Sequence, residues 1–321
     1  MTGTATVDIA GAQMGGAARY AAELRSYLTR TGRRDIHVIG GGQHVGPAWL
    51  LRRESFGRPG TGRRIAVNNV SFAGPGGPRW VLLRNALHFL AETEEAELEP
   101  GLRRSVGREG MVVRLAVRRA DVVVVPCTAM AERVLRILPG IRSRLVARPH
   151  PVSPTVMSLA ERRSAILCPV LFAPYKRMDA RLAELLAAVD EHGDPEVQVR
   201  VTAAPADLPP SVASHPRLEC LGRLDHRDLR TAWAQARAVY FPTGLESFGY
   251  PLAEARVNGQ PVIARDTAQN LEVGGAALCG YQPGDPDSLR QAVKSALTAD
   301  LTPDPAPFDP DAYFGWLLGS S

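Results

Sequence analysis

The chain has 321 residues, of which 45% are hydrophobic, and it carries 38 Lys or Arg against 33 Asp or Glu, for a formal net charge of +5 at pH 7. No apolar run approaches the roughly 18 residues of a membrane-spanning helix, and the first residues lack the basic stretch and long apolar run of a secretory signal, so a soluble, cytoplasmic protein is expected. Cys127, Cys168, Cys220 and Cys279 form no C-x-x-C pair, which predicts reduced thiols rather than a zinc site.

Alternating strand and helix patterns run through the first half of the chain. Apolar stretches that fit buried strands occur at residues 7–10, 37–40, 79–83 and 121–126. Helical patterns cover residues 17–29, which Gly32 is placed to end, and residues 129–138. The Gly-, Pro- and Arg-rich stretch 57–78 predicts a long loop around one short strand, and three prolines within 148–160 indicate a linker.

The alternation resumes after this linker. Further strand patterns occur at residues 165–170, 197–203, 218–222, 238–242 and 261–264. Further helical patterns cover residues 177–190, 228–236, 251–258 and 287–298. Such alternation predicts parallel sheets, and we expect an α/β fold of two doubly wound domains, residues 1–150 and 151–321, that face each other across a cleft. In such sheets ligands bind beyond the carboxyl ends of the strands.

The most informative segment is AVYFPTGLESFGYPLAEARVNGQPVIA, residues 238–264. Its first strand ends at Phe241, Pro251 suits the first turn of a helix, and Gly259 is placed to end that helix. Glu246 then lies in the loop, and Glu254 lies about one turn into the helix.

An anion site is expected between these two glutamates. The backbone amides of Phe248, Gly249 and Tyr250 cluster at a helix N-terminus, which favours a phosphate group. Because carboxylates accept hydrogen bonds from vicinal hydroxyls, a ribose on one side of a diphosphate and a hexose on the other would use both Glu246 and Glu254.

This segment resembles the signature of the retaining glycosyltransferases of family 4, P-S-x-x-E-x-F-G-x-P-x-x-E-A-x-x-x-G-x-P-V-I-A, whose members have the GT-B fold of two Rossmann-like domains. The matching residues are Pro242, Thr243, Glu246, Phe248, Gly249, Pro251, Glu254, Ala255, Gly259, Pro261, Val262, Ile263 and Ala264. The resemblance implies that Glu246 contacts hydroxyls of the transferred sugar, that Glu254 holds the nucleotide ribose, and that the segment from Phe248 to Pro251 meets the donor phosphates.

A second resemblance lies upstream, where residues 174–179 read P-Y-K-R-M-D against the family's P-x-K-G-x-D element. Its lysine binds the donor diphosphate, and Lys176 is one of two lysines in a chain with 36 arginines. A cation there would neutralise charge that develops on the leaving diphosphate, the main electrostatic task when no metal is present. The family also carries an arginine about five residues earlier, where this chain has Leu171; Arg177 or an arginine of the N-terminal domain could substitute.

The N-terminal domain offers weaker candidates. Gly15 and Gly16 resemble the glycines of the family's first loop, which let amides approach a phosphate, although the spacing is not that of a dinucleotide fingerprint. His88 lies where the family often carries a histidine near the reaction centre, but a histidine among apolar residues is often structural. Asn85 and Arg84 are further candidates.

Two more segments of the C-terminal domain carry candidate residues. Leu221 and Gly222 resemble the strand end that borders the nucleotide base, with a plain strand end as the equal alternative. Asp285 and Asp287 form a D-x-D pattern, which in another fold class of glycosyltransferases binds a metal; we interpret Asp287 instead as a helix N-cap and expect no metal and no organic cofactor.

The resemblance covers residues 121–298 well and residues 1–120 in outline. It implies metal-independent transfer of a sugar, expected to be a hexose, from a nucleotide-diphosphate sugar to a hydroxyl acceptor with retention of configuration. Glu246, Lys176 and His88 would lie at the reaction centre. The acceptor would be a small molecule or a glycan, in bacterial natural-product or glycan and glycolipid biosynthesis.

Basic side chains are concentrated in residues 1–160, whereas the remainder is mildly acidic. Either a solvated arginine-rich surface or an anionic partner, including peripheral contact with a membrane, explains this asymmetry. Nucleic acid is not expected, because aromatic residues do not alternate with the arginines as base stacking needs. Two other functions stay open: a non-catalytic GT-B-like binding or scaffold protein, and an unrelated nucleotide-sugar enzyme such as an epimerase or a phosphorylase-like enzyme.

Overall fold

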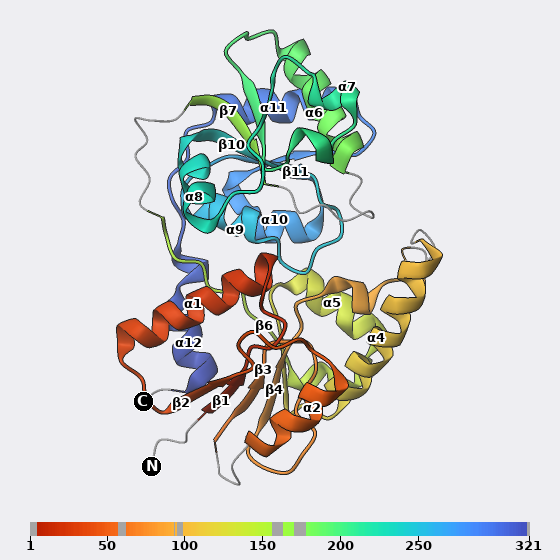
Figure 1. Ribbon diagram of the computed structural model, residues 1–321, viewed down its shortest axis with the longest axis vertical. Helices are drawn as coiled ribbons and strands as arrows, with labels where there is room; N and C mark the ends of the chain where they lie inside the picture. Colours follow the sequence, from red (N-terminus) through yellow and green to blue (C-terminus); the bar gives the residue numbers. More distant parts are fainter. Residues whose placement is uncertain are drawn as a thin grey trace. The chain divides into compact units, whose positions relative to one another are not determined.

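The computed structural model describes residues 5–56, 62–92, 94, 99–155, 163–169 and 178–319. The chain divides into two compact units. The first comprises Met1–Ser153, Leu245–Phe248 and Pro307–Ser321, and the second comprises Pro154–Gly244 and Gly249–Ala306. Each unit is built on its own six-stranded parallel sheet (Figure 1).

The sheet of the first unit has the strand order β2-β1-β3-β4-β5-β6. Its strands are β1 Ala5–Asp8, β2 Ile36–Ile39, β3 Arg64–Ala66, β4 Arg79–Leu82, β5 Val122–Val125 and β6 Leu145–Ala147. Its helices are α1 Gly15–Thr31, α2 Pro47–Arg53, α4 Pro100–Arg118, α5 Thr128–Ile137 and α12 Pro310–Leu318. The strand order reverses beside β1, and ligands of doubly wound sheets bind at such a reversal.

The sheet of the second unit has the strand order β12-β11-β10-β7-β8-β9. Its strands are β7 Arg163–Cys168, β8 Gln198–Val201, β9 Leu218–Cys220, β10 Ala236–Phe241, β11 Val262–Arg265 and β12 Leu278–Tyr281. Its helices are α6 Met178–His192, α7 Pro210–Ala213, α8 His226–Gln235, α9 Tyr250–Val257, α10 Ala268–Gly274 and α11 Pro286–Thr298. Counted from the β9 edge, this is the 3-2-1-4-5-6 order of dinucleotide-binding folds, with its reversal between β7 and β10.

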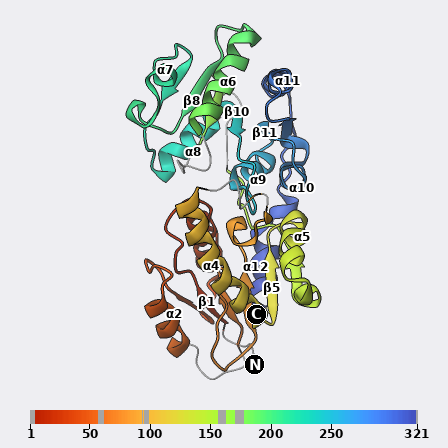
Figure 2. The ribbon, with the colours of Figure 1, turned by 90° about the vertical axis from the view of Figure 1, so that its right-hand side faces the viewer.

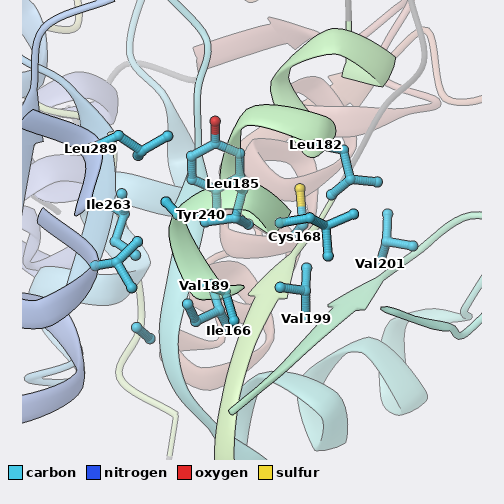
Figure 3. Close-up of a cluster of buried hydrophobic side chains, with 14 of the residues drawn as sticks. Ile166, Cys168, Leu182, Leu185, Val189, Val199, Val201, Tyr240, Ile263 and Leu289 are labelled. Carbon is cyan, nitrogen blue, oxygen red and sulfur yellow. The ribbon is translucent and has the colours of Figure 1, made fainter. Parts of the chain in front are cut away.

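One face of the second sheet is covered by α6 and α11 (Figure 3). Leu185 of α6 and Leu289 of α11 lie over Ile166, Tyr240 and Ile263 of the strands, and all five side chains are buried. Each large apolar side chain buried in this way contributes about 1.5–3 kcal/mol relative to an exposed one. This layer fixes β7 and β10, the two strands that flank the reversal, in a rigid frame.

The predicted fold class, α/β with two doubly wound parallel sheets, is confirmed, and so are most of the predicted elements. Helix α1 ends as expected at Gly32, which has φ 65° and donates its N–H to Leu28 O. Helices α2 and α4 were not predicted. The buried residues of α4, such as Val106, Val113 and Val117, have the helical spacing, but exposed apolar residues between them blur the pattern.

The end of the chain corrects the predicted boundaries, since α12 belongs to the first unit and not to a second domain of residues 151–321. Phe314 lies in ring contact with Tyr20 and Tyr27 of α1, with centroid distances of 5.7 Å and 5.1 Å. Arg63 donates to the carbonyl oxygens of Trp316 and Leu317 and so satisfies the end of the helix. The aromatic side chains of this short helix need an apolar surface, and α1 supplies it.

The four cysteines are free thiols; Cys127 and Cys168 are buried, whereas Cys220 and Cys279 are partly exposed. Burial raises the pKa of Cys168 to about 12 and that of Cys279 to about 11. Both thiols are therefore protonated and unreactive at neutral pH. In the described parts of the chain, no helix is long and apolar enough to cross a membrane.

Candidate functional site

In the second unit the candidate site begins where the strand order reverses. Strand β7 ends at Cys168 and its neighbour β10 ends at Phe241, so the loops that follow both strands start at the same edge of the sheet. The predicted Lys176 and Arg177 come after β7 in the sequence and lie outside the described residues. The loop after β10 contains the glutamate motif.

The strand, loop and helix predicted for this motif are confirmed as β10 and α9. Gly249 is the N-cap residue of α9 and has φ 80°. A Cβ atom there would lie 2.9 Å from Leu252 Cδ1 and 3.1 Å from a ring carbon of Phe241, so only glycine fits. Pro251 occupies the first turn, where its missing N–H costs no hydrogen bond. The amides of Leu252 and Ala253 donate to Gly249 O at 2.9 Å and 3.4 Å, so the carbonyl group of the N-cap residue closes the first turn.

Helix α9 ends just before Gly259, as predicted. Gly259 has φ 57°, and a Cβ atom there would lie 2.6 Å from Leu301 O. Glu254 is half-buried on α9, one turn after Tyr250. The helix therefore presents Glu254 from a fixed backbone.

The four residues Leu245–Phe248 belong to the first unit although they follow a strand of the second. Ser247 Oγ donates to Arg84 O at 2.7 Å, and Cys127 Sγ donates to Ser247 O at 3.4 Å. Phe248 is 2% exposed and its ring centroid lies 5.1 Å from that of His150. Phe248 thus anchors the loop, and half-buried Glu246 comes immediately before two anchored residues, Ser247 and Phe248.

Arg84 contacts two of the predicted features that belong to the first unit. Its N–H donates to Asn69 Oδ1 at 2.6 Å, and its guanidinium donates to Gly16 O in the first turn of α1. The guanidinium also lies 4.7 Å from the ring centroid of Tyr20. Gly15 takes φ 56° at the start of the same helix. The structure therefore places Arg84 beside both the first-loop glycines and the segment that carries Glu246.

His88 lies in the 3₁₀ turn η2, Ala86–Phe89, which follows β4. It is 6% exposed; its Nε2 lies 3.4 Å from Asn85 Nδ2 and 3.7 Å from Glu109 Oε2. Burial lowers the pKa of His88, and Glu109 opposes this shift only in part. The ring is therefore neutral at pH 7, and its buried Nδ1 has no hydrogen-bond partner among the described residues.

Arg265 is a candidate that the sequence reasoning missed. It ends β11, which pairs with β10 so that Ala264 faces Phe241. Its guanidinium lies against Gly244 in the loop after β10, where any Cβ atom would collide with Arg265 Nη1. Its Nε is buried and has no hydrogen-bond partner within the described part of the chain. The only signal in the sequence is its place immediately after a buried strand.

Leu221 and Gly222 follow β9, the edge strand of the same sheet. Their N–H groups donate to Val201 O and Ala203 O, and Gly222 has φ 69°. They lie at the carboxyl end of the sheet, as the candidate site requires.

The predicted helix cap is wrong by two residues. Asp285, not Asp287, is the N-cap of α11, and its carboxylate accepts from Ser288 N at 3.0 Å. Asp287 lies in the first turn and pairs with Arg290. Pro286 explains the shift, because proline favours the first helical position and moves the cap to the residue before it.

Part of the chain is similar to known glycosyltransferases. Residues 164–299 match the family model described as Glycosyl transferases group 1. Over 80 residues the chain is 32% identical to O-antigen chain mannosyltransferase B of Escherichia coli, which covers 25% of this chain and 21% of that protein. The chain thus spans about a fifth of the length of the curated relative it matches.

Solved structures extend the likeness to the whole fold. Sucrose-phosphate synthase from Thermosynechococcus elongatus matches with a TM-score of 0.61 and 15% identity, covering 98% of this chain and 94% of that chain. TarM matches with a TM-score of 0.58 and 11% identity, covering 77% of this chain and 50% of that chain. At such identities the likeness shows the fold alone, and that fold is the predicted GT-B architecture.

Proposed function

We propose that this chain is a glycosyltransferase that transfers a sugar, expected to be a hexose, from a nucleotide-diphosphate sugar to a hydroxyl group. The observation that carries the proposal is the β10–α9 motif at the strand reversal of the second unit, inside the segment that matches the glycosyltransferase family model. The resemblance to family 4 supports retention of configuration, with neither metal nor organic cofactor. We propose a cytoplasmic role in bacterial natural-product or glycan and glycolipid biosynthesis.

The donor is proposed to bind at the carboxyl edge of the second sheet. The segment Phe248, Gly249 and Tyr250 at the N-terminus of α9 would meet its phosphates, since helix N-termini favour anions. Glu254 would accept hydrogen bonds from the ribose, and Leu221 and Gly222 would border the base. Glu246, anchored through Ser247, would contact the transferred sugar.

Charge on the departing diphosphate needs cations, and Lys176 is the first of them by resemblance. We propose Arg265 as the second, in place of the arginine that the family pattern has near Leu171. Arg265 ends a strand adjacent to β10, its guanidinium lies beside the motif loop, and its Nε has no partner in the described residues. A guanidinium is well suited to phosphate because it offers several fixed donors.

The acceptor, a small molecule or a glycan, is proposed to bind the first unit near Arg84 and His88. Arg84 is a cation tied to the first turn of α1. Neutral His88 would place its ring near the reaction centre and could accept a hydrogen bond there.

The test is a thermal-shift and calorimetric screen of UDP, GDP, ADP and TDP and their common sugars. Native protein is compared with Lys176→Ala and Glu254→Ala, and with Lys294→Ala as the matched lysine control, because Lys294 is exposed on α11. Selective binding of one nucleotide that is lost in the first two variants and kept in the third supports the proposal. Equal binding of the nucleotide by all variants would contradict the proposal.

Two further measurements distinguish a glycosyltransferase from a GT-B-like scaffold protein and from an unrelated nucleotide-sugar enzyme. A glycosyltransferase releases nucleotide slowly from bound donor through hydrolysis, even without acceptor, whereas a scaffold protein releases none. An epimerase that depends on a dinucleotide would show bound NAD in its absorbance spectrum after purification.

A further inference from the structure

Among the described residues, the largest group of exposed apolar side chains on one element lies on helix α4. Met111, Val112 and Leu115 are 59%, 47% and 54% exposed. On the opposite side of the helix, Val106 and Val113 are buried in the first unit. The exposed apolar face is therefore additional to the face that α4 uses for folding.

Arginines share this exposed face. At about 100° per residue, the spacing of residues 104, 108, 111, 115 and 118 places them in one stripe along the helix. The stripe reads Arg104, Arg108, Met111, Leu115 and Arg118, and all five side chains are exposed. Apolar side chains with cations at both ends are the pattern of a helix that lies in a membrane interface.

The arginines of this stripe have no acidic neighbours on the helix to neutralise them. Glu109 is the one acidic residue within Pro100–Arg118, and its carboxylate accepts from Ser105 Oγ at 3.0 Å and faces His88. No ion pair of Arg104, Arg108 or Arg118 is found in the described part of the chain. Their charge is therefore available to an external anion.

We infer that α4 docks the first unit on an anionic lipid surface, with Met111, Val112 and Leu115 entering the interface and the arginines meeting lipid phosphates. Helix α4 runs along the outside of the first unit (Figures 1 and 2), which suits an interfacial contact. Charge complementarity and the apolar centre favour a bilayer over nucleic acid, because the stripe has no aromatic side chain on which a base could stack. The inference does not rest on the proposed enzyme activity.

Vesicle flotation tests the inference with the full chain. Vesicles of phosphatidylcholine alone are compared with vesicles of phosphatidylcholine and phosphatidylglycerol in equal parts. We expect binding to the anionic vesicles only, and release as salt screens the charges. Because each arginine near an anionic surface is worth about 1 kcal/mol, Arg104→Gln with Arg108→Gln should lower the partition coefficient roughly thirtyfold.

Matched variants separate the helix from the general charge of the protein. Arg25→Gln with Arg142→Gln removes two exposed arginines from other elements of the first unit, and should leave binding within about twofold of native. Met111→Ser with Leu115→Ser should abolish binding, whereas Leu271→Ser, at a leucine that is 53% exposed on α10, should not. An equal loss of vesicle binding in the two control variants would overturn the inference.

Depth of insertion gives a second readout. Val112→Trp places an indole beside the stripe, and its fluorescence should shift to the blue with anionic vesicles and be quenched by brominated lipid chains. An unshifted spectrum, or binding to single-stranded oligonucleotides in preference to vesicles, would contradict a lipid surface.

Discussion

Ser247 Oγ donates a hydrogen bond of 2.7 Å to the carbonyl oxygen of Arg84. The two residues are 163 positions apart, and the bond fastens the loop that carries Glu246 to the loop that follows β4. Arg84 in turn reaches Gly16. One short hydrogen bond thus links the glutamate loop to the loops of the first unit.

Removal of this bond should loosen the loop. Ser247→Ala is expected to lower the free energy of unfolding by about 0.5–1.5 kcal/mol, because the Arg84 carbonyl loses its donor. Urea unfolding measures the change. Ser26→Ala on α1, where the side chain is exposed, serves as the control and should change stability by less than about 0.5 kcal/mol. The same urea midpoint for Ser247→Ala and native protein would show that the bond contributes nothing.

Gly249→Ala should be more harmful than Gly32→Ala, although both glycines have positive φ, 80° and 65°. Each substitution carries the cost of a left-handed backbone, roughly 1–2 kcal/mol. A Cβ atom at Gly32 meets nothing within 4 Å, whereas at Gly249 it meets Leu252 and Phe241. We expect an additional loss of about 1–3 kcal/mol at Gly249 from the close contacts. The difference between the two variants in thermal unfolding measures this; equal losses would contradict the close packing.

Arg265→Gln should weaken nucleoside diphosphate binding about tenfold to a hundredfold, because a charged hydrogen bond of roughly 1.5–3 kcal/mol is lost. Affinity for the corresponding nucleoside, which has no phosphate, should stay unchanged. Arg290→Gln, on the surface of α11, is the matched control. Calorimetric titration of each variant gives the result, and an equal loss for nucleoside and diphosphate would point to a general disturbance of the sheet.

Acid should destabilise the first unit through His150. Burial lowers the pKa of His150 well below its usual value, and Arg84 adds to the shift. The unfolded chain therefore binds more protons than the folded one below about pH 6.5, so stability falls as pH drops through that value, by up to about 1.4 kcal/mol per pH unit.

The measurement is urea unfolding between about pH 7.5 and about pH 5.5. His150→Phe removes the titrating group but keeps a ring in the contacts with Tyr20 and Phe248, and its stability should depend less on pH. His44→Gln, at an exposed histidine, should follow native protein. Parallel curves for native protein and His150→Phe would assign the acid sensitivity to other groups.

Local chemistry explains what the sequence could predict. The valines of β5 form a short, continuous apolar run, and Gly32 and Gly249 have a positive φ, which glycine adopts at the least cost. These signals are contained in a few neighbouring residues, so most of the strands, α1 and the β10–α9 motif could be placed from the sequence, whereas β6 and β12 were not predicted.

Long-range packing explains what could not be predicted. The assignment of α12 to the first unit depends on α1, nearly 300 residues earlier, and the anchoring of Ser247 depends on Arg84. Arg265 looks like any surface arginine until β11 is placed beside β10. The exposed Met111 and Leu115 of α4 obscured a helix whose buried positions are regular.

The contact between α12 and α1 sets an order of events during synthesis. Tyr20 and Tyr27 leave the ribosome early, but Phe314, which covers them, is added only after the second unit has been translated. The nascent first unit therefore exposes the apolar surface of α1 around Tyr20 and Tyr27 until the end of synthesis. During this interval we expect chaperones to bind the chain.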